Sequence, residues 1–214
     1  MKNNILFSLF LITTFFCGAA CAQQKGAYDL SSLLKQETRI TSSAKKISKI
    51  TDGTRKGISL TGIVWLKDID FATGTIDVDL RGKDVFQQSF LGIAFHGVDT
   101  VTYDAIYFRP FNFQSTDTLR RRHTVQYISQ PDFSWDKLRA DHPLVYENAV
   151  NPFPLATDWF HAHIVVKADE IVVYVNRSPK PSLSVKKLNN RQHGLIGLWN
   201  DSLPGDFANL VIKQ

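Results

Sequence analysis

The chain of 214 residues carries 25 Lys and Arg against 20 Asp and Glu, a formal net charge of +5, and 43% of its residues are hydrophobic. Three positive charges adjoin at Arg120-Arg121-Arg122, but no basic stripe with interleaved aromatic residues recurs, which argues against nucleic acid as a partner. The triplet is expected at the solvated end of a hairpin. Cys17 and Cys21 lie in or beside an N-terminal leader, so we expect no disulfide, thiol nucleophile or cysteine metal site in the folded part.

The N-terminal segment has the pattern of an export signal. Met1-Lys2 precedes an apolar run from Ile5 to Phe16, and small residues follow that end in Ala20-Cys21-Ala22. This pattern predicts a signal peptide over residues 1–22. The run is too short for a spanning helix, and no later segment supplies one. The alternative is a lipid anchor at Cys21, because Gly18-Ala19-Ala20-Cys21 resembles a bacterial lipobox with glycine in place of the usual aliphatic residue. We therefore expect an exported protein, periplasmic or extracellular, with or without an anchor at Cys21.

About 190 residues follow this leader, enough for one domain with a substantial core. Short apolar or alternating runs succeed one another with turn residues between them, which is typical of strands. The expected strands span residues 46–51, 57–63, 74–80, 89–95, 105–111, 123–129, 160–166, 171–176, 183–185, 195–199 and 208–212. The first two are joined across Asp52-Gly53, a strong hairpin dipeptide. Helical periodicity is limited to residues 30–36 and 135–140.

This order of elements predicts the fold class. Many short strands without a repeated strand–helix–strand pattern favour an all-β fold. We expect a two-sheet antiparallel jelly-roll sandwich with short helical pieces. No internal repeat or low-complexity linker indicates a second domain, so residues 23–214 are expected to form a single domain.

Alternation within four of the strands predicts which side chains share the outer face of one sheet. The large apolar positions expected in the core are Leu91, Ile93, Phe95, Ile106, Phe108, Val125, Tyr127, Ile196 and Leu198. The outward positions then carry His96, Tyr107, Arg109, Arg122, Thr124, Gln126 and Trp199, beside the small residues Gly92 and Ala94. Solvent-facing positions are rarely filled with such residues.

This outward set has the composition of a carbohydrate site. Sugar rings offer hydroxyl groups in a fixed geometry and an apolar patch of C–H groups, so their sites combine an aromatic platform with planar polar groups. The outer face of a curved sheet would form the groove. The same residues allow another interpretation, in which Tyr107, Arg109 and Trp199 pack beneath the long loop that follows.

The segment from Gln130 to Asp158 is long for a connection within a compact domain, and such segments are usually functional or disordered. Its aromatic content argues against disorder. It carries Trp135, Arg139 and Glu147, which we expect to fold over one end of the groove. Partial burial beside Tyr146 would there raise the pKa of Glu147. The alternative for the charged residues is a structural role in a helix cap or an ion pair.

Five stretches of the chain together resemble a known family. They are AIYFRPFN at 105–112, RHTVQYIS at 122–129, WFHAHIVVK at 159–167, VYVN at 173–176, and Gly-Leu-Trp with Asp-Phe-Ala-Asn-Leu within 197–210. From about Gly57 onwards the chain is similar to the concanavalin A-like lectin/glucanase superfamily, and within it to exported bacterial proteins grouped with the 3-keto-disaccharide hydrolase domain. The resemblance implies a two-sheet jelly roll with carbohydrate as the ligand class. The residues expected to contact the sugar are Tyr107, Asn112, Arg122, Gln126, Trp135, Arg139 and Trp199.

Hydrolysis and elimination are two ways to cleave a glycosidic bond, and they require different residues. Ordinary glycosidases use two carboxyl groups across the scissile bond, and the glutamates of this chain never approach the paired spacing of the laminarinase-like branch. Asp77-x-Asp79 is expected as a solvated outer face. A ketone at C3 of a sugar acidifies the hydrogen at C2, so that one base and one oxyanion stabiliser suffice for elimination. We expect His96 or Glu147 as this base and Arg109 as the stabiliser.

Two histidines at His161-x-His163 share one face of a strand, a spacing that can bind a metal. No nearby carboxylate completes a recognised ligand set in the sequence, so we expect neither a metal nor a cofactor. Two classes of function stay open. One is a carbohydrate-active enzyme, a glycoside hydrolase or a lyase, with 3-keto-glycosides as one substrate class. The other is a noncatalytic glycan-binding module of the cell envelope, and a third alternative is an envelope protein whose groove holds a partner chain.

Overall fold

The computed structural model describes residues 25–33, 40–42 and 46–214, and the expected signal peptide with Cys17 and Cys21 lies outside these ranges. The elements are β1 (Lys25–Tyr28), α1 (Leu30–Leu33), β2 (Ile40–Ser42), β3 (Lys46–Asp52), β4 (Arg55–Phe71), β5 (Gly74–Arg81), β6 (Ser89–Gly97), β7 (Tyr103–Phe108), α2 (Thr118–Arg121), β8 (Val125–Gln130), α3 (Trp135–Asp141), β9 (Glu147–Asn148), β10 (Phe160–Val166), β11 (Glu170–Val175), β12 (Leu183–Lys186) and β13 (Gly194–Lys213). No helix within the described ranges is long and apolar enough to cross a membrane.

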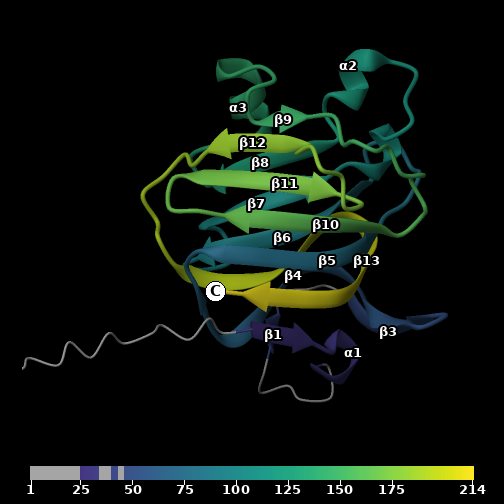
Figure 1. Cartoon of the computed structure of the whole chain (residues 1–214), viewed down its shortest axis with the longest axis vertical. Coiled ribbons are helices and arrows are strands. Elements are labelled where there is room, and N and C mark those ends of the chain that lie inside the picture. Colours follow the sequence, from purple (N-terminus) through teal and green to yellow (C-terminus); the bar gives the residue numbers. More distant parts are fainter. Residues whose placement is uncertain (1–24, 34–39, 43–45) are drawn as a thin grey trace, which may run out of the picture.

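Two antiparallel layers form the fold (Figure 1). The front layer has the order β12-β11-β10-β5 and continues into residues 206–213 of β13. The back layer has the order β9-β8-β7-β6 and continues into residues 195–202 of β13 and then into β4. The predicted all-β antiparallel sandwich is confirmed, and so is the hairpin across Asp52-Gly53, where Asp52 pairs with Arg55.

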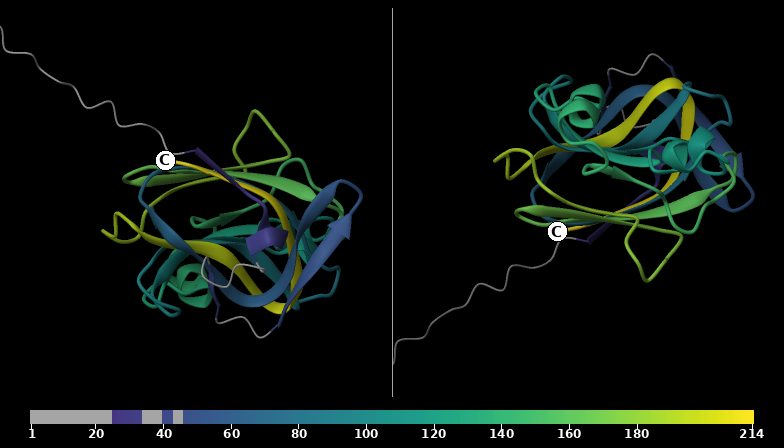
Figure 2. Two further views of the ribbon diagram at one scale, coloured as in Figure 1. Left: turned by 90° about the horizontal axis from the view of Figure 1, so that it is seen from below. Right: turned by 90° about the horizontal axis from the view of Figure 1, so that it is seen from above.

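The last strand joins the two layers. The two strands expected at 195–199 and 208–212 are parts of the single strand β13, which crosses from one layer to the other (Figure 2). Its pairing with β4 is interrupted between Asn200 and Gly205, where the strand bends. A Cβ atom at Gly205 would lie 2.7 Å from Asn200 Nδ2 and 3.0 Å from Leu91 Cβ, so a larger residue would have to displace the Asn200 side chain.

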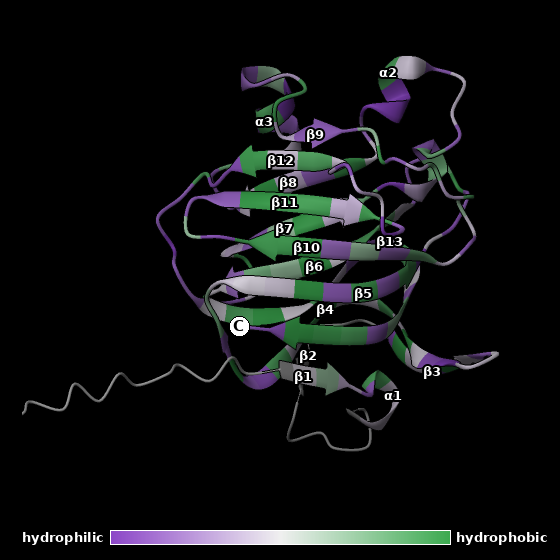
Figure 3. Ribbon diagram, viewed as in Figure 1, coloured by the Kyte–Doolittle hydropathy of each residue, from purple (hydrophilic) through white to green (hydrophobic). Residues whose placement is uncertain are grey.

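The core lies between the layers and is built by alternation. Ile76, Val78 and Leu80 of β5 are fully buried, as are Leu91 and Phe95 of β6. Hydrophobic residues, green in Figure 3, lie mainly on the strands, whereas the connections between strands are mainly hydrophilic. These inward positions agree with the period of two that the sequence predicts.

Two segments differ from expectation. Arg120 and Arg121 belong to the short helix α2 and not to a hairpin end, because Asp117 accepts hydrogen bonds from the backbone N–H groups of Leu119 and Arg120 and so caps a helical turn. The strand expected at 105–111 ends at Phe108, since Pro110 has no N–H to donate and begins a 3-10 turn.

Phe160 tests the packing between the layers. Its ring lies 5.0 Å from that of Phe108 and 5.2 Å from that of Phe113, and the residue is 1% exposed. We expect Phe160→Ala to lower the free energy of unfolding by about 3–5 kcal/mol, because it leaves a cavity in a close-packed core. Phe153→Ala, at a side chain that is 46% exposed, is the control. Equal losses of stability in urea denaturation of the two variants would contradict this account of the core.

Candidate functional site

Four of the seven polar or aromatic side chains expected to share an outer sheet face do come together on the back layer. The hydroxyl of Tyr107 donates to Gln126 Oε1 at 2.8 Å, and Arg109 Nη2 donates to both of these oxygen atoms. Arg109 Nη1 also donates to the backbone oxygen of His123 at 3.0 Å. The ring of Trp199 lies 5.1 Å from that of Tyr107. The alternation therefore placed these residues on the correct face of β7, β8 and β13.

That face is covered, and the expectation of an open groove is wrong at this position. Tyr107 is 3% exposed, Arg109 5% and Gln126 is fully buried. A second apolar cluster, separate from the core between the layers, contains Tyr107 together with Leu138 of α3. The long segment thus folds over the face and fills it, which is the alternative that the sequence left open.

His96 does not join the group. Its backbone has φ of +48°, so β6 is distorted at this residue and the alternation breaks. The side chain is fully buried at the end of the core, with Nε2 2.7 Å from the oxygen of Ala72 and Nδ1 3.1 Å from Asp104. The role of His96 as a base at a groove is therefore not supported by its position.

Glu147 is the centre of a cluster of cations. Arg139 donates to its two oxygen atoms from Nε at 3.1 Å and Nη2 at 2.8 Å, and Arg109 Nη1 lies 3.6 Å away. Burial raises the pKa of Glu147, but these hydrogen bonds and the nearby positive charges outweigh it, so the pKa lies below its usual value. The expected increase is wrong, because the sequence does not reveal that two arginines converge on this carboxylate.

His123, the first residue of the strand expected at 123–129, is also a member of this cluster. Its Nδ1 lies 2.8 Å from Glu147 Oε2, although the two groups lack the alignment of a hydrogen bond. Burial lowers the pKa of His123 from its usual value. In the sequence, His123 is marked only by its position just before β8. That position does not indicate that Glu147 of β9 lies beside it. We call Tyr107, Arg109, His123, Gln126, Arg139 and Glu147 the arginine cluster.

Apart from Trp199, which lies beside Tyr107, the other predicted contact residues are dispersed. Trp135 of α3 is 48% exposed, with the guanidinium of Arg139 5.2 Å from its ring centre. Trp199 is half-buried and donates from Nε1 to the hydroxyl of Tyr103 at 3.0 Å. Asn112 is buried, and Arg122 is exposed at the end of α2. These four side chains lie on or beside four different elements of the fold.

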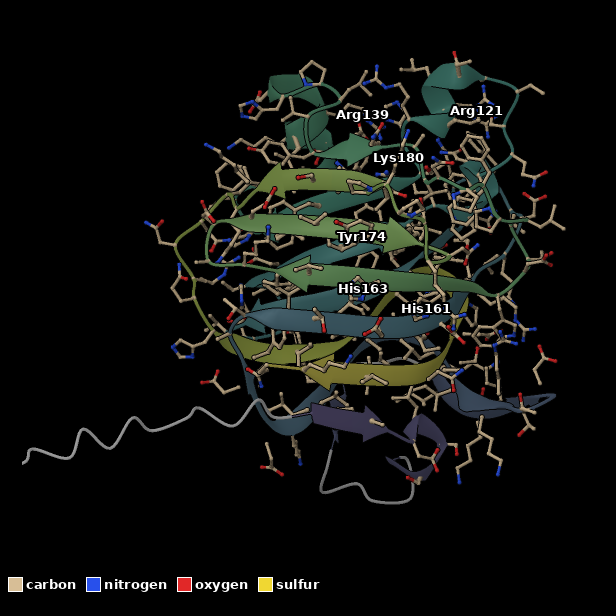
Figure 4. The ribbon with its side chains drawn as sticks, in the orientation of Figure 1. Arg121, Arg139, His161, His163, Tyr174 and Lys180 are labelled. Carbon is tan, nitrogen blue, oxygen red and sulfur yellow. The ribbon has the colours of Figure 1, made fainter. Side chains whose placement is uncertain are left out.

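An open hollow of about 470 Å³ lies instead on the outer face of the front layer. Its lining includes Asp77 of β5, His161 and His163 of β10, Tyr174 of β11, and Arg177 and Ser178 of the following turn. Figure 4 shows His161, His163 and Tyr174 on this face. We call it the sheet-face hollow.

The register between β5 and β10 places two histidines opposite two aspartates in and beside this hollow, and we call these four residues the His–Asp ladder. His161 is opposite Asp79 and His163 is opposite Asp77. Asp77 Oδ1 is 2.7 Å from His163 Nδ1 and 3.2 Å from His161 Nε2, and Asp79 Oδ1 is 2.9 Å from His161 Nδ1. In the described part of the chain, no group of His, Cys, Asp or Glu side chains is arranged to hold a metal ion.

Hydrogen bonds within the His–Asp ladder shift the pKa values of His161, Asp77 and Asp79. Hydrogen bonds to Asp77 and Asp79 raise the pKa of His161 to about 9, so this ring is cationic at neutral pH. Burial raises the pKa of Asp77, but the bonds from His161 and His163 outweigh it and lower the value to about 2. Burial also raises the pKa of Asp79, but hydrogen bonds from His161, Asn209 and Arg55 outweigh it and lower the pKa below its usual value.

The free energy of unfolding should therefore depend on pH through His161 and Asp77. Because the pKa of His161 is raised on folding, its contribution is fully present below the unfolded value of 6.5 and is lost as the pH rises through about 9. The lowered pKa of Asp77 adds a second limit, since that contribution is lost as the pH falls towards 2.

We therefore expect His161→Gln to lose on the order of 0.5–1 kcal/mol near pH 6 relative to the unchanged protein, the range of partly exposed pairs. The difference should shrink as the pH rises past about 9, as measured by urea unfolding across the pH range. His142→Gln, at an exposed histidine, gives the reference profile. A difference that stays constant with pH would contradict the assigned charge of His161.

Comparison with known proteins defines the fold more closely. No protein-family model and no curated protein matches the sequence. Among solved structures, the chain is similar to the carbohydrate binding module CBM66 from Bacillus subtilis, at 12% identity and a TM-score of 0.51, covering 80% of this chain and 98% of that one. It is also similar to a protein with a galectin-like fold from Bacillus subtilis, at 12% identity and a TM-score of 0.56, covering 90% and 98%.

A third similar structure is the exoplasmic/lumenal domain of VIP36 in its Ca²⁺/Man-bound form, at 9% identity and a TM-score of 0.50, covering 79% and 81% of the two chains. At these identities the likeness establishes the fold alone. It supports the two-sheet, lectin-like β-sandwich that the sequence predicts. It does not single out the 3-keto-disaccharide hydrolase group.

Proposed function

We propose that this chain binds carbohydrate in the sheet-face hollow and acts as a glycan-binding module. One observation carries the proposal: an open hollow of about 470 Å³ in which one aromatic ring meets planar polar groups whose positions the sheet fixes. The fold that the chain shares with a carbohydrate-binding module from Bacillus subtilis supports the ligand class by analogy.

The groups in the hollow suit a sugar ring. Tyr174 is half-buried, so its ring offers an apolar surface to the C–H groups of a pyranose or furanose. The ring of His163 lies beside it, with centres 5.9 Å apart. Because His163 Nδ1 faces Asp77, its Nε2 is left to meet a hydroxyl group of the ligand.

Arg177 and Ser178 approach the hollow from a tight turn. Asn176 and Arg177 have φ of +50° and +58°, and Ser178 N donates to Val175 O at 3.0 Å. These values are typical of a type I′ turn, which is narrow and well defined. The turn therefore holds a guanidinium and a hydroxyl group at the end of β11, where sugar hydroxyls could meet both a donor and an acceptor.

The charges favour binding over ordinary glycoside hydrolysis. That reaction requires one carboxyl group that keeps a proton and a second that is ionised. Asp77 and Asp79 have lowered pKa values, so both are ionised at neutral pH. Glu147 is also ionised and is 2% exposed beneath Arg139. None of the three is suited to donate a proton to a leaving group.

A glycan array followed by titration calorimetry tests the proposal. For a glycan that the array identifies, we expect Tyr174→Ala to weaken binding by roughly tenfold or more, since stacking on an aromatic ring contributes on the order of 1 kcal/mol beyond the area it buries. Tyr174→Phe keeps the ring and should retain most of the affinity. Val101→Ala, at an exposed apolar side chain outside the hollow, should leave it unchanged. Glycan binding that Tyr174→Ala leaves intact would place the site elsewhere.

A second candidate function is elimination from 3-keto-glycosides, and the arginine cluster is the observation that favours it. His123 has a lowered pKa and lies beside Glu147 and near Arg109, so a neutral imidazole is available as a base. The base would take the C2 proton, and the electrons would pass to the C3 oxygen as an enolate. The C1–oxygen bond would then break with a C1=C2 double bond left in the sugar, and the imidazolium would return the proton to the leaving oxygen. Arg139, whose side chain is 35% exposed at the edge of the cluster, would stabilise the enolate oxygen, because Arg109 is covered.

Incubation with oxidised and unoxidised glycosides separates the two functions. Release of an aldose from the 3-keto-glycoside alone, lost in His123→Gln while the melting temperature is kept, would establish the elimination. Binding without release of any aldose, retained in His123→Gln, would favour the glycan-binding module.

A further inference from the structure

We propose that a second hollow, at the end of the sandwich beside α2, binds the anionic group of an acidic saccharide. This hollow has a volume of about 420 Å³, and its lining includes Asp84, Gln114, Thr116, Arg120, Leu155 and Thr157. We call it the loop-end hollow. It shares no lining residue with the sheet-face hollow, so it is a separate site on the same domain.

Three connections build the walls of the loop-end hollow. Asp84 lies between β5 and β6, Gln114 and Arg120 lie between β7 and β8, and Thr157 lies between β9 and β10. The second and third connections are tied together, because Gln114 Nε2 donates to the oxygen of Pro154 at 3.5 Å. The helix α2, which carries Arg120, stands above the layers at the upper right of Figure 1.

The guanidinium of Arg120 is held in one position. It lies 4.3 Å from the ring centre of Phe86, which in turn meets the ring of Phe111 at 5.7 Å. Its Nε donates to Asn112 Oδ1 at 3.3 Å, and Asn112 is buried. A stacked and hydrogen-bonded arginine loses little further side-chain freedom when a ligand binds to it.

This guanidinium has no carboxylate partner among the described residues. None of the ion pairs in that part of the chain includes Arg120, Arg121 or Arg122. The neighbouring carboxylate of Asp117 is engaged instead by the backbone N–H groups of Leu119, at 2.8 Å, and Arg120, at 3.2 Å. The terminal nitrogen atoms of Arg120 therefore remain available to a carboxylate or sulfate, the groups that its planar fork binds in a bidentate manner.

The rest of the lining favours a sugar as the carrier of that anionic group. Gln114, Thr116 and Thr157 offer amide and hydroxyl groups. Asp84 can accept hydrogen bonds from sugar hydroxyls. Leu155 and Phe111 supply apolar surface for C–H groups. This lining suits a uronate or a sulfated sugar.

Titration calorimetry with trigalacturonate as the acidic probe and maltotriose as the neutral probe tests the inference. We expect trigalacturonate to bind, and Arg120→Gln to weaken it by roughly tenfold or more because a charge-assisted bidentate contact is lost. Lys49→Gln removes the same charge from an exposed position on β3 and should change the affinity less than about twofold in 0.15 M salt. A sulfated trisaccharide as a third probe distinguishes the two anionic groups.

Three results would overturn the inference. The first is the absence of binding of both trigalacturonate and the sulfated trisaccharide to the unchanged protein. The second is an equal loss in Arg120→Gln and Lys49→Gln, which would indicate a general positive field. The third is NMR shift changes on trigalacturonate confined to Tyr174 and His163, with none at Gln114, Thr116 or Thr157. An unchanged melting temperature of Arg120→Gln ensures that a loss reflects the contact itself, and maltotriose binding at Tyr174 reports separately on the sheet-face hollow.

Discussion

The pairing of β13 with both layers is the constraint on which the rest of the structure depends. Its first half lies between β4 and β6, and its second half pairs with β5, so one continuous strand fixes how the two sheets lie relative to each other. The bend between Asn200 and Gly205 sets the change of direction. The arginine cluster and the sheet-face hollow each lie on the outer face of a layer that β13 holds in place, because that face presents alternate residues of its strands.

The outer face of the back layer is occupied by buried polar and charged side chains. Arg109 and Glu147 are almost fully covered, yet each has several partners, which is the condition under which buried charges are tolerated. Such a cluster positions the long segment that carries α3 over the sheet. A network of this kind can preorganise a site, but its members have little unused hydrogen-bonding capacity for a ligand.

The front layer and the loop end show the opposite pattern. In the sheet-face hollow, Arg177 is exposed and Tyr174 half-buried, and in the loop-end hollow Arg120 is fixed without an ion partner in the described chain. If both hollows engage one polymeric glycan, the second contact becomes intramolecular and the combined affinity exceeds that of either.

The sequence by itself determined the class of fold and the two faces of most strands. Apolar residues with a period of two, such as Ile76, Val78 and Leu80, can bury only one face, and that constraint is local. It also brought Tyr107, Arg109 and Gln126 together correctly. The tertiary structure alone decided what covers those faces. The pKa of Glu147 depends on Arg109, Arg139 and His123, which come from three other parts of the chain. His96 left its expected face through one positive φ, and both hollows arise where separate connections or strands meet. Contacts between distant segments have no period in the sequence, so only the folded chain defines them.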